Sequence, residues 1–478
     1  MKRIKAKINL ILLVLLLILI GFAVYYMFFI RGKETDNPLF QEAEVARENK
    51  EYSLAISKYK ESINTQPAYT PAYVKAAEIL EEKGHTEEAL AVLEKGASYA
   101  ADKALIYQQI ASIYANTANP EMALQTIQKA KEYKSTTTIY RDYISYLYLN
   151  NEFDKATEAI TQIPGDDAYA NYIKAILHFN DLKKALEYAQ KAQTKSSEYK
   201  YQQLYETIKA SSTTEDNTIE DLMLISVDAI NAGEYALSLG ALNQIKVENQ
   251  YYEGSYIYDA FIYNRYRMYD QAIESLNTAL LYTQNNYQVY KLLAYAHLER
   301  AELEEAEANI VSALGFPKVD ADTYFLAAKI FKAQNKFSQA LENLAKISNL
   351  KNNYNYTKLQ IEVLLLNKQY EQTIAAANSF LEETPPTDEQ RAIVMSLLAW
   401  ANYNLGNKVQ AKETLQEAES VYRFSPYTQY YLGLYYSQEN ESTPAKSYFE
   451  KAIDLDMEGH ITQLTQQELN SLDDAESE

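Results

Sequence analysis

The residue types that most often carry out catalysis are sparse in this chain. The sequence holds no cysteine and four histidines, which lie at positions 85, 178, 297 and 460. The absence of cysteine excludes a thiol nucleophile and a cysteine-based zinc site. Each histidine stands alone, and the usual zinc, serine-nucleophile and phosphate-loop motifs do not occur. We therefore predict that the protein uses no metal and no other cofactor.

Carboxylates are abundant, but the sequence does not locate an acid–base pair among them. The 65 Asp and Glu residues follow the polar sides of amphipathic segments, as on solvated helix faces. The net charge is −20, which would repel the phosphates of a nucleic acid. We predict a protein that is not an enzyme and does not bind nucleic acid. An envelope enzyme that acts on carbohydrate stays open, because no spacing rule in this chain locates the carboxylate pair it would need.

Length and composition favour long helices over a single compact core. At 478 residues the chain is too long for one ordinary core, so several domains or a repeat array is expected. It contains 12 Gly and 10 Pro, which is few for turn-rich β-structure. Its 44 Tyr suit seams between helices, where the ring packs and the hydroxyl reaches water.

The N-terminal segment has the character of a membrane anchor. Residues 8–30 carry no charge, and as a helix they would span roughly 35 Å, enough for a hydrocarbon core of about 30 Å. Aromatic residues lie near its far end, where an interfacial belt belongs. A cleaved signal peptide is the alternative, but no small-x-small cleavage site comes after it. We predict one uncleaved transmembrane helix that contacts the lipid bilayer through residues 8–30.

The charges that flank this segment predict its orientation. Lys2, Arg3, Lys5 and Lys7 precede it, whereas only Arg31 and Lys33 closely follow it. The positive-inside rule then places the N-terminus in the cytoplasm and the rest of the chain across the membrane. The predicted location is a cell membrane, crossed once, with the C-terminal part extracytoplasmic. The simple anchor and the lack of cysteine favour a bacterial source.

Small residues recur at a nearly constant interval along the rest of the chain. The interval between neighbours is mostly 33 or 34 residues. The positions are Ala55, Ala89, Ala123, Ala156, Ala185, Ser238, Ala272, Ala306, Ala340, Thr373, Ala411 and Ala445. Large residues usually lie three before and four after each one, which is the spacing of one helix face. A second helix lies upstream, with Gly or Asn in the turn between the two. Such a period predicts stacked helix pairs.

These helix pairs resemble the tetratricopeptide repeat family. The segments "KEYSLAISKYKESINTQP" and "KQYEQTIAAANSFLEETPP" share its aromatic-x-x-small entry to the second helix and its closing proline. The resemblance implies an all-α fold, a right-handed superhelical solenoid of about twelve helix-turn-helix repeats after the transmembrane helix. It also implies protein or peptide partners, without indicating one process. Phe40 and Glu44 stand where the family's carboxylate clamp would need Lys and Asn, so that clamp is not predicted.

The interval breaks once, between Ala185 and Ser238. Large residues at helical spacing and then the polar run 211–218 predict an atypical helix followed by a loop. The predicted organisation is a basic cytoplasmic N-terminus (1–7), a transmembrane helix (8–30), about five repeats (31–195), an atypical helix and linker (196–218), about seven repeats (219–458), and a capping helix with an acidic tail (459–478).

The concave surface of the solenoid is the candidate binding site. By analogy with the family, the exposed face of the first helix of each repeat lines it. In the C-terminal array these positions hold aromatic residues with scattered Lys and Asn, which suit an extended peptide or a partner helix. They are Ile257, Phe261, Asn264, Lys291, Tyr295, Phe325, Lys329, Lys332, Trp400, Tyr403 and Tyr430. The alternative is that the rings pack between repeats or against the capping helix.

Two functions fit these features. The first is a membrane-anchored scaffold or assembly factor of the cell envelope, which binds proteins or peptides on its concave surface. The second is a chaperone-like or regulatory subunit tethered beside a membrane enzyme or a translocation machine. If the topology is reversed, the array is instead a cytoplasmic adaptor.

The orientation can be tested on intact cells with a proximity-labelling enzyme fused at either end. We expect a fusion after Glu478 to label envelope or secreted proteins, and a fusion before Met1 to label cytosolic ones, because the charge bias retains the N-terminus. Labelling of cytosolic proteins by both fusions would contradict the extracytoplasmic assignment.

Overall fold

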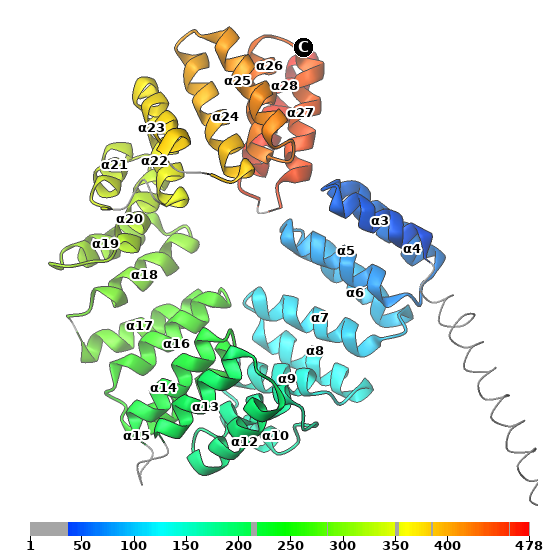
Figure 1. Ribbon diagram of the computed structural model, residues 1–478, viewed down its shortest axis with the longest axis vertical. Helices are drawn as coiled ribbons and strands as arrows, with labels where there is room; N and C mark the ends of the chain where they lie inside the picture. The colour runs from blue at the N-terminus through cyan, green and yellow to red at the C-terminus, as the bar shows by residue number, and fades with distance from the viewer. Residues whose placement is uncertain are drawn as a thin grey trace, which may run out of the picture. The chain divides into compact units, whose positions relative to one another are not determined.

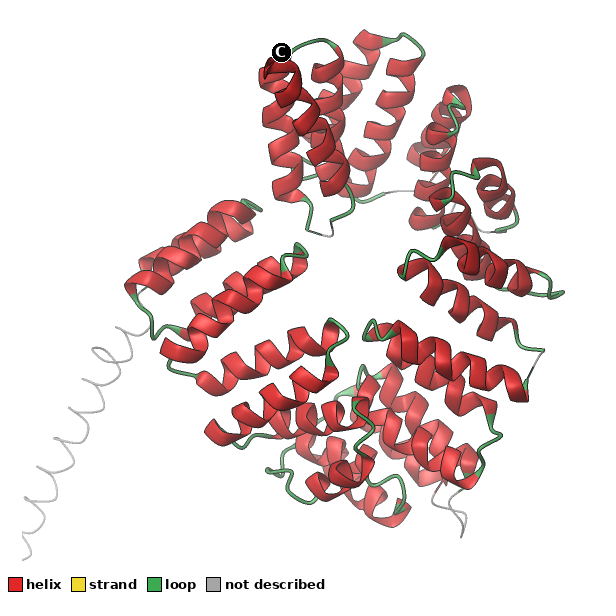
Figure 2. Cartoon of the chain, turned by 180° about the vertical axis from the view of Figure 1, so that it is seen from behind, coloured by secondary structure: helices red, strands yellow, loops and turns green. Residues whose placement is uncertain are grey.

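Helices joined by short turns make up the part of the chain that the computed structural model describes, which is residues 37–211, 218–283, 285–348, 353–383, 386–457 and 459–477. These residues form 26 helices and no strand, as Figure 2 shows. The all-α prediction is therefore confirmed. The predicted transmembrane helix over 8–30 lies outside the described residues. Within them, no helix combines the length and the apolar character that a membrane crossing requires.

The chain divides into two compact units, residues 1–106 and 107–478. The predicted break at 196–218 thus lies inside the second unit. The described helices of the first unit are α3 (Pro38–Glu48), α4 (Tyr52–Thr65), α5 (Thr70–Glu82) and α6 (Thr86–Tyr99). Helix α7 (Lys103–Asn116) begins just before the division.

The second unit continues the same alternation of helices along the chain (Figure 1). Its further helices are α8 (Pro120–Tyr133), α9 (Thr137–Leu149), α10 (Phe153–Ile160), α11 (Ala168–Leu177), α12 (Leu182–Lys195), α13 (Tyr199–Ser211), α14 (Ile219–Asn231), α15 (Tyr235–Glu248), α16 (Glu253–Arg265), α17 (Tyr269–Tyr282), α18 (Tyr287–Glu299), α19 (Leu303–Leu314), α20 (Ala321–Ala333), α21 (Phe337–Ala345), α22 (Tyr354–Leu366), α23 (Tyr370–Glu383), α24 (Asp388–Asn404), α25 (Lys408–Val421), α26 (Pro426–Gln438), α27 (Ser442–Leu455) and α28 (Thr462–Ser477). Twelve helix pairs result, from α3/α4 to α11/α12 and from α14/α15 to α26/α27, with α13 and α28 outside the pairs.

The turn inside a pair has one geometry almost throughout. In eleven pairs the residue five positions before the recurring small residue has a positive φ; the pair α11/α12 is the exception. The next N–H donates to a carbonyl oxygen five residues earlier, as in Met268 to Tyr263 and Lys336 to Phe331, both at 2.8 Å. This is the Schellman ending of a helix, which satisfies otherwise unpaired carbonyls. The sequence predicts Gly or Asn there, yet Lys50, Ala118, Arg267, Ala301 and Lys368 also adopt it, with φ between 57° and 59°.

The recurring small residues are the points where the helices of a pair meet. All twelve are buried, with exposed fractions of 0–1 %. A side chain no larger than Thr lets the neighbouring helix approach closely, and larger residues one turn away fill the space around it. The recurring small residues thus lie buried in helix pairs, as the period predicts.

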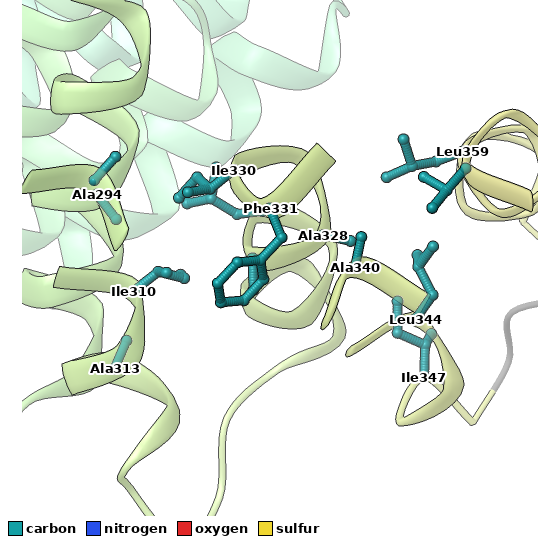
Figure 3. Close-up of a cluster of buried hydrophobic side chains, with 14 residues drawn as sticks. Ala294, Ile310, Ala313, Ala328, Ile330, Phe331, Ala340, Leu344, Ile347 and Leu359 are labelled. Atoms are coloured by element: carbon teal, nitrogen blue, oxygen red, sulfur yellow. The ribbon is translucent and has the colours of Figure 1, made fainter. Parts of the chain in front are cut away.

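The core between repeats is built from such residues together with branched and aromatic ones. In the close-up of Figure 3, Phe331 of α20 lies between Ile310 and Ala313 of α19 on one side and Ala340 and Leu344 of α21 on the other. All five of these residues are buried, with exposed fractions of 0–3 %. Each repeat thus completes the core of the one before it, as expected of a stack in which no pair buries its apolar face alone.

Helix α15 packs against helices that are distant in the chain as well as against its neighbours. It contacts α9 and α11 as well as α14 and α16. Eight of its residues are buried, on all sides of the helix. Gly240 permits the contact with α9, because a Cβ there would lie 2.7 Å from the Tyr148 hydroxyl and 2.8 Å from Phe179. Helix α13, which precedes the pair α14/α15, lies within the segment where the sequence predicts an atypical helix.

The last pair, α26/α27, provides a direct test of the close approach. Gly433 of α26 faces the ring of Phe449 in α27, and an added Cβ would lie 2.5 Å from two ring carbons. Because Phe449 is fully buried, its ring has little room to move. We expect Gly433→Ala to destabilise this pair by about 1–3 kcal/mol, the usual cost of overpacking. Amide hydrogen exchange resolved by segment should show the loss in α26 and α27.

A double-mutant cycle separates the steric clash from the change in helix propensity. Phe449→Leu removes the ring, so Gly433→Ala should cost clearly less in that background than in the native chain. Equal costs in the two backgrounds would show that the contact with Phe449 does not limit the residue at position 433.

Candidate functional site

A groove of about 780 Å³ crosses the first helices of three successive repeats, α16, α18 and α20. We call it the main groove. The lining residues are Glu253, Gly254, Ile257, Tyr258, Phe261, Asn264, Arg265, Asn286, Gln288, Lys291, Leu292, Tyr295, Asp322, Phe325, Leu326 and Lys329. These helices also contact one another directly, α16 with α18 and α18 with α20. The repeat therefore places three equivalent helix faces side by side.

The lining follows the repeat period residue by residue. Ile257, Lys291 and Phe325 lie 34 positions apart, and so do Phe261, Tyr295 and Lys329. Tyr258, Leu292 and Leu326 also lie 34 positions apart. The prediction of binding residues from the sequence omitted all three. Because each step of 34 residues returns to the same place on the next repeat, this period was the signal that could have found them.

Seven of the eleven predicted binding residues line the main groove, namely Ile257, Phe261, Asn264, Lys291, Tyr295, Phe325 and Lys329. Lys332 lines a second pocket of about 470 Å³, which shares Phe325 and Lys329 with the main groove. We call this pocket the basic extension, because Lys329, Lys332 and Lys358 line it with Glu362 as its one carboxylate. It also includes Tyr427 and His460.

The other three predicted residues lie in neither hollow and pack within the last repeats. Trp400 stacks on Tyr403 with ring centroids 5.0 Å apart and planes 2° apart. The Tyr403 hydroxyl donates to Glu439 Oε1 at 2.8 Å. Tyr430 lies against Phe449, in a cluster that α28 completes with Leu469 and Leu472. For these three, the alternative that the rings pack between repeats and against the capping helix describes their surroundings.

Two of the groove's cations lack a charged partner. Lys291 Nζ lies 2.8 Å from Asp320 Oδ2, whereas Arg265 and Lys329 form no ion pair with any residue in the described ranges. In the basic extension, Lys332 Nζ lies 2.5 Å from Glu362 Oε2 and Lys358 Nζ 3.6 Å from Glu362 Oε1. One carboxylate thus faces two ammonium groups there, and the surface formed by the groove and its extension is positive.

The carboxylates beside the groove are already engaged. Asp322 accepts a hydrogen bond from the Tyr356 hydroxyl at 2.6 Å, and this bond, with burial, raises the pKa of Tyr356 to about 12. Burial also raises the pKa of Tyr295 in the groove wall. These hydroxyls stay protonated at neutral pH, so Tyr295 offers the groove a hydrogen-bonding group and an apolar ring.

A buried polar cluster on α9 is the other concentration of charge in the second unit. Arg141 contacts Asp142 at 2.8 Å and Glu234 at 3.4 Å, and Gln108 donates to Asp142 at 2.5 Å. Burial raises the pKa of Asp142, while Arg141 opposes the shift. Arg141 engages both carboxylates, so the cluster serves to join helices rather than to transfer protons.

Three of the four histidines have local partners for their side chains in the structure. His85 contacts Glu88 at 3.2 Å, His178 contacts the Lys174 carbonyl oxygen at 2.7 Å, and His297 contacts Glu302 at 2.7 Å. Nowhere in the described part of the chain do three His, Asp or Glu side chains converge as a metal site would need.

Comparison with known families identifies the repeats. Residues 70–103, 104–137 and 428–456 match one sequence profile described as a tetratricopeptide repeat, and residues 394–425 match a second with the same description. These four segments of the chain match tetratricopeptide repeats. The matched segments cover helix pairs toward both ends of the array. The small-residue contact recurs in the pairs between them, and the same turn recurs in all of those pairs except α11/α12. Tetratricopeptide repeats generally mediate protein–protein interaction, and their fold is typically a scaffold without catalytic activity.

Solved structures of other repeat proteins resemble this chain at low identity. A tetratricopeptide repeat protein from Parabacteroides merdae is 15 % identical, with a TM-score of 0.43 over 53 % of this chain and 98 % of its own. Yeast Tom70 is 15 % identical, with a TM-score of 0.34 over 92 % of this chain and 95 % of its own. Pseudomonas aeruginosa pilF is 16 % identical, with a TM-score of 0.34 over 46 % and 96 %. No curated protein matches the sequence significantly.

The ion pair beside the groove provides a test of its electrostatics. Asp320 caps α20 by accepting from the Thr323 N–H at 2.8 Å, and it also accepts from Lys291. Burial raises the pKa of Asp320, but the hydrogen bonds from Lys291 and Thr323 outweigh it and hold the pKa below the ordinary value. The pKa of an Asp in the unfolded chain is about 3.9, so a lower pKa in the folded chain stabilises the fold at pH values above about 3.9. This stability is lost as the pH falls through the folded pKa.

We expect Asp320→Asn to destabilise the tetratricopeptide array by less than about 1 kcal/mol at neutral pH, because solvent screens this partly exposed pair. Asn keeps the helix cap, so the difference reports the loss of the charge together with the Oδ2 acceptor for Lys291 and Tyr287. Urea unfolding of both proteins should show the difference at pH 7 and its progressive decrease as the pH falls below about 3.9. A difference that persists unchanged at low pH would mean that the carboxylate charge is not its cause.

Proposed function

We propose that this protein is a membrane-anchored interaction scaffold, whose main groove binds partner proteins or peptides. The observation that carries the proposal is the groove itself, in which three repeats present apolar side chains together with two cations that have no described ion-pair partner. Binding hot spots have this composition, with aromatic residues at the centre and charged residues at the rim. Tetratricopeptide repeats generally bind proteins, which supports the same use here.

The anchor and its orientation remain predictions from the sequence. Residues 8–30 would hold the array at a membrane, and the flanking charges would place it on the extracytoplasmic side. An assembly factor of the cell envelope combines these features. Tethering also raises the effective concentration of the groove near other membrane proteins, so that weak contacts suffice.

The groove can be tested by photocrosslinking in the membrane of the native host. We expect a photoreactive amino acid in place of Phe261, which lines the groove and is 40 % exposed, to capture one or a few proteins. The matched control replaces Val409 of α25, which is 73 % exposed and lies outside the groove. Equal capture at both positions, or none at position 261, would overturn the assignment of the groove.

The same experiment separates the scaffold from the chaperone-like alternative. A scaffold should give a discrete crosslinked band that persists when protein synthesis stops. A holder of newly exported chains should give a diffuse set of bands that disappears as export ceases.

A further inference from the structure

The main groove contains one buried polar side chain that the fold leaves unpaired. Asn264 lies in the last turn of α16 and is 7 % exposed. Neither its carboxamide nitrogen nor its oxygen has a hydrogen-bond partner among the described residues. Each such group destabilises the fold when it is buried without a partner. A residue that lowers stability in this way, at the wall of a groove, points to a ligand that completes it.

Other asparagines in helices of the second unit show that a helical position does not by itself leave the side chain without a hydrogen-bond partner. Asn343 donates to the Gln339 carbonyl oxygen at 2.9 Å, and Asn402 donates to that of Leu398 at 3.1 Å. The same bond to the residue four positions earlier occurs at Asn150, Asn171, Asn309 and Asn404. It is the usual local partner of a polar side chain in a helix. Asn264 does not use it.

We propose that the occupant of the main groove is an extended, acidic segment of a partner polypeptide, with its main chain bonded to Asn264. This inference rests on the proposed binding function and specifies the chemistry of the partner. A main-chain amide offers one acceptor and one donor, which is what a carboxamide needs. A rotation of the Asn264 side chain into the groove brings the two together, and such rotations are common on binding.

The unpaired carboxamide favours an extended chain over a partner helix. In a helix the main-chain N–H and C=O groups bond to each other, so only the side chains could reach Asn264. An extended segment presents its amides whatever its sequence. Three helices with axes about 8–10 Å apart span about 16–20 Å between the two outer axes, which an extended chain, at about 3.3 Å per residue, crosses in about five or six residues.

The charge of the groove indicates an acidic segment. The main groove and the basic extension together present five Lys or Arg side chains against three carboxylates. The whole chain, by contrast, has a net charge of −20. Arg265 and Lys329, both exposed, have no ion-pair partner among the residues that the structure describes. A carboxylate of the partner placed there would give a charge-assisted contact and would also attract an acidic chain to this face of an acidic protein.

The apolar part of the groove adds a requirement for large side chains. Tyr258, Phe261, Leu292 and Phe325 provide aromatic and aliphatic surface along the same three helices. Side chains of an extended segment alternate between two sides, so apolar residues can face this surface while carboxylates face the cations. The expected ligand therefore combines acidic residues with aromatic or aliphatic ones.

A random library of displayed linear octapeptides, selected on the full chain in detergent, tests the proposal. We expect selected peptides to combine Asp or Glu with Phe, Tyr, Leu or Ile. A synthetic consensus peptide should bind at least tenfold more tightly than the same peptide with Lys in place of its acidic residues. Its affinity should also fall as ionic strength rises from about 0.1 M to 1 M. Enrichment of basic or uncharged peptides, or no enrichment, would overturn the proposal.

The role of Asn264 is tested by two matched variants and a helical ligand. Asn264→Leu should lower affinity for the consensus peptide about tenfold or more while leaving stability in urea equal or higher, because it removes an unpaired buried group. Asn343→Leu alters a buried asparagine in α21, outside the groove, and should not change affinity. Unchanged binding by Asn264→Leu, or equal binding of a consensus peptide stapled as a helix, would refute the main-chain contact.

Failure of these tests is distinct from failure of the proposed function. If photocrosslinking at position 261 captures a partner while the peptide selection enriches no acidic segment, the groove is a binding site and the inferred ligand chemistry is wrong. If neither gives a signal, both proposals fall.

Discussion

The close approach of two helices at a small buried residue is the constraint on which the rest of this structure depends. Twelve such residues, all but fully buried, fix how each pair packs. Because the contact repeats at nearly equal intervals, it brings the first helices of neighbouring repeats side by side and carries each groove position to the next repeat. The main groove is therefore a consequence of the period, with Ile257, Lys291 and Phe325 at one register position of three helices.

The same period explains how much the sequence could predict. A repeated helix contact is written directly into residue spacing, so the number of pairs and the small-residue contacts could be predicted. Seven of the residues that line the groove were also predicted, from the family's surface positions applied to each repeat. The turn conformations could not be predicted, because Lys50, Arg267 and Lys368 take a left-handed φ that their side chains do not favour. The Schellman hydrogen bonds and the packed helices on both sides impose that geometry, and neither is visible in one residue's type.

The position of a residue within its repeat could not show whether other side chains pack over its aromatic ring. Trp400, Tyr403 and Tyr430 occupy positions like those of the groove residues, but neighbouring tyrosines and α28 pack against them. The cluster around Trp400 and Tyr430 includes residues of α28, the helix that comes after the last repeat, which a position rule does not include. Helix α15 had a readable signal, since a segment that is apolar on all sides must be buried on all sides. Its contact with α9 explains that composition.

The use of charge separates the structural parts of the second unit from its groove. Where buried acids join helices they are matched, as in Lys246 with Asp259 at 2.5 Å and Arg141 with Asp142 and Glu234. An unmatched buried charge would be costly there, because the low-dielectric interior cannot replace the lost hydration. At the groove the matching stops: Arg265 and Lys329 face solvent without a described ion-pair partner, and Asn264 is buried without a described hydrogen-bond partner. A scaffold held together by twelve repeated contacts can tolerate a local loss of stability of this size. The unpaired groups are then available to a ligand, and the rigid repeats on either side hold them in place.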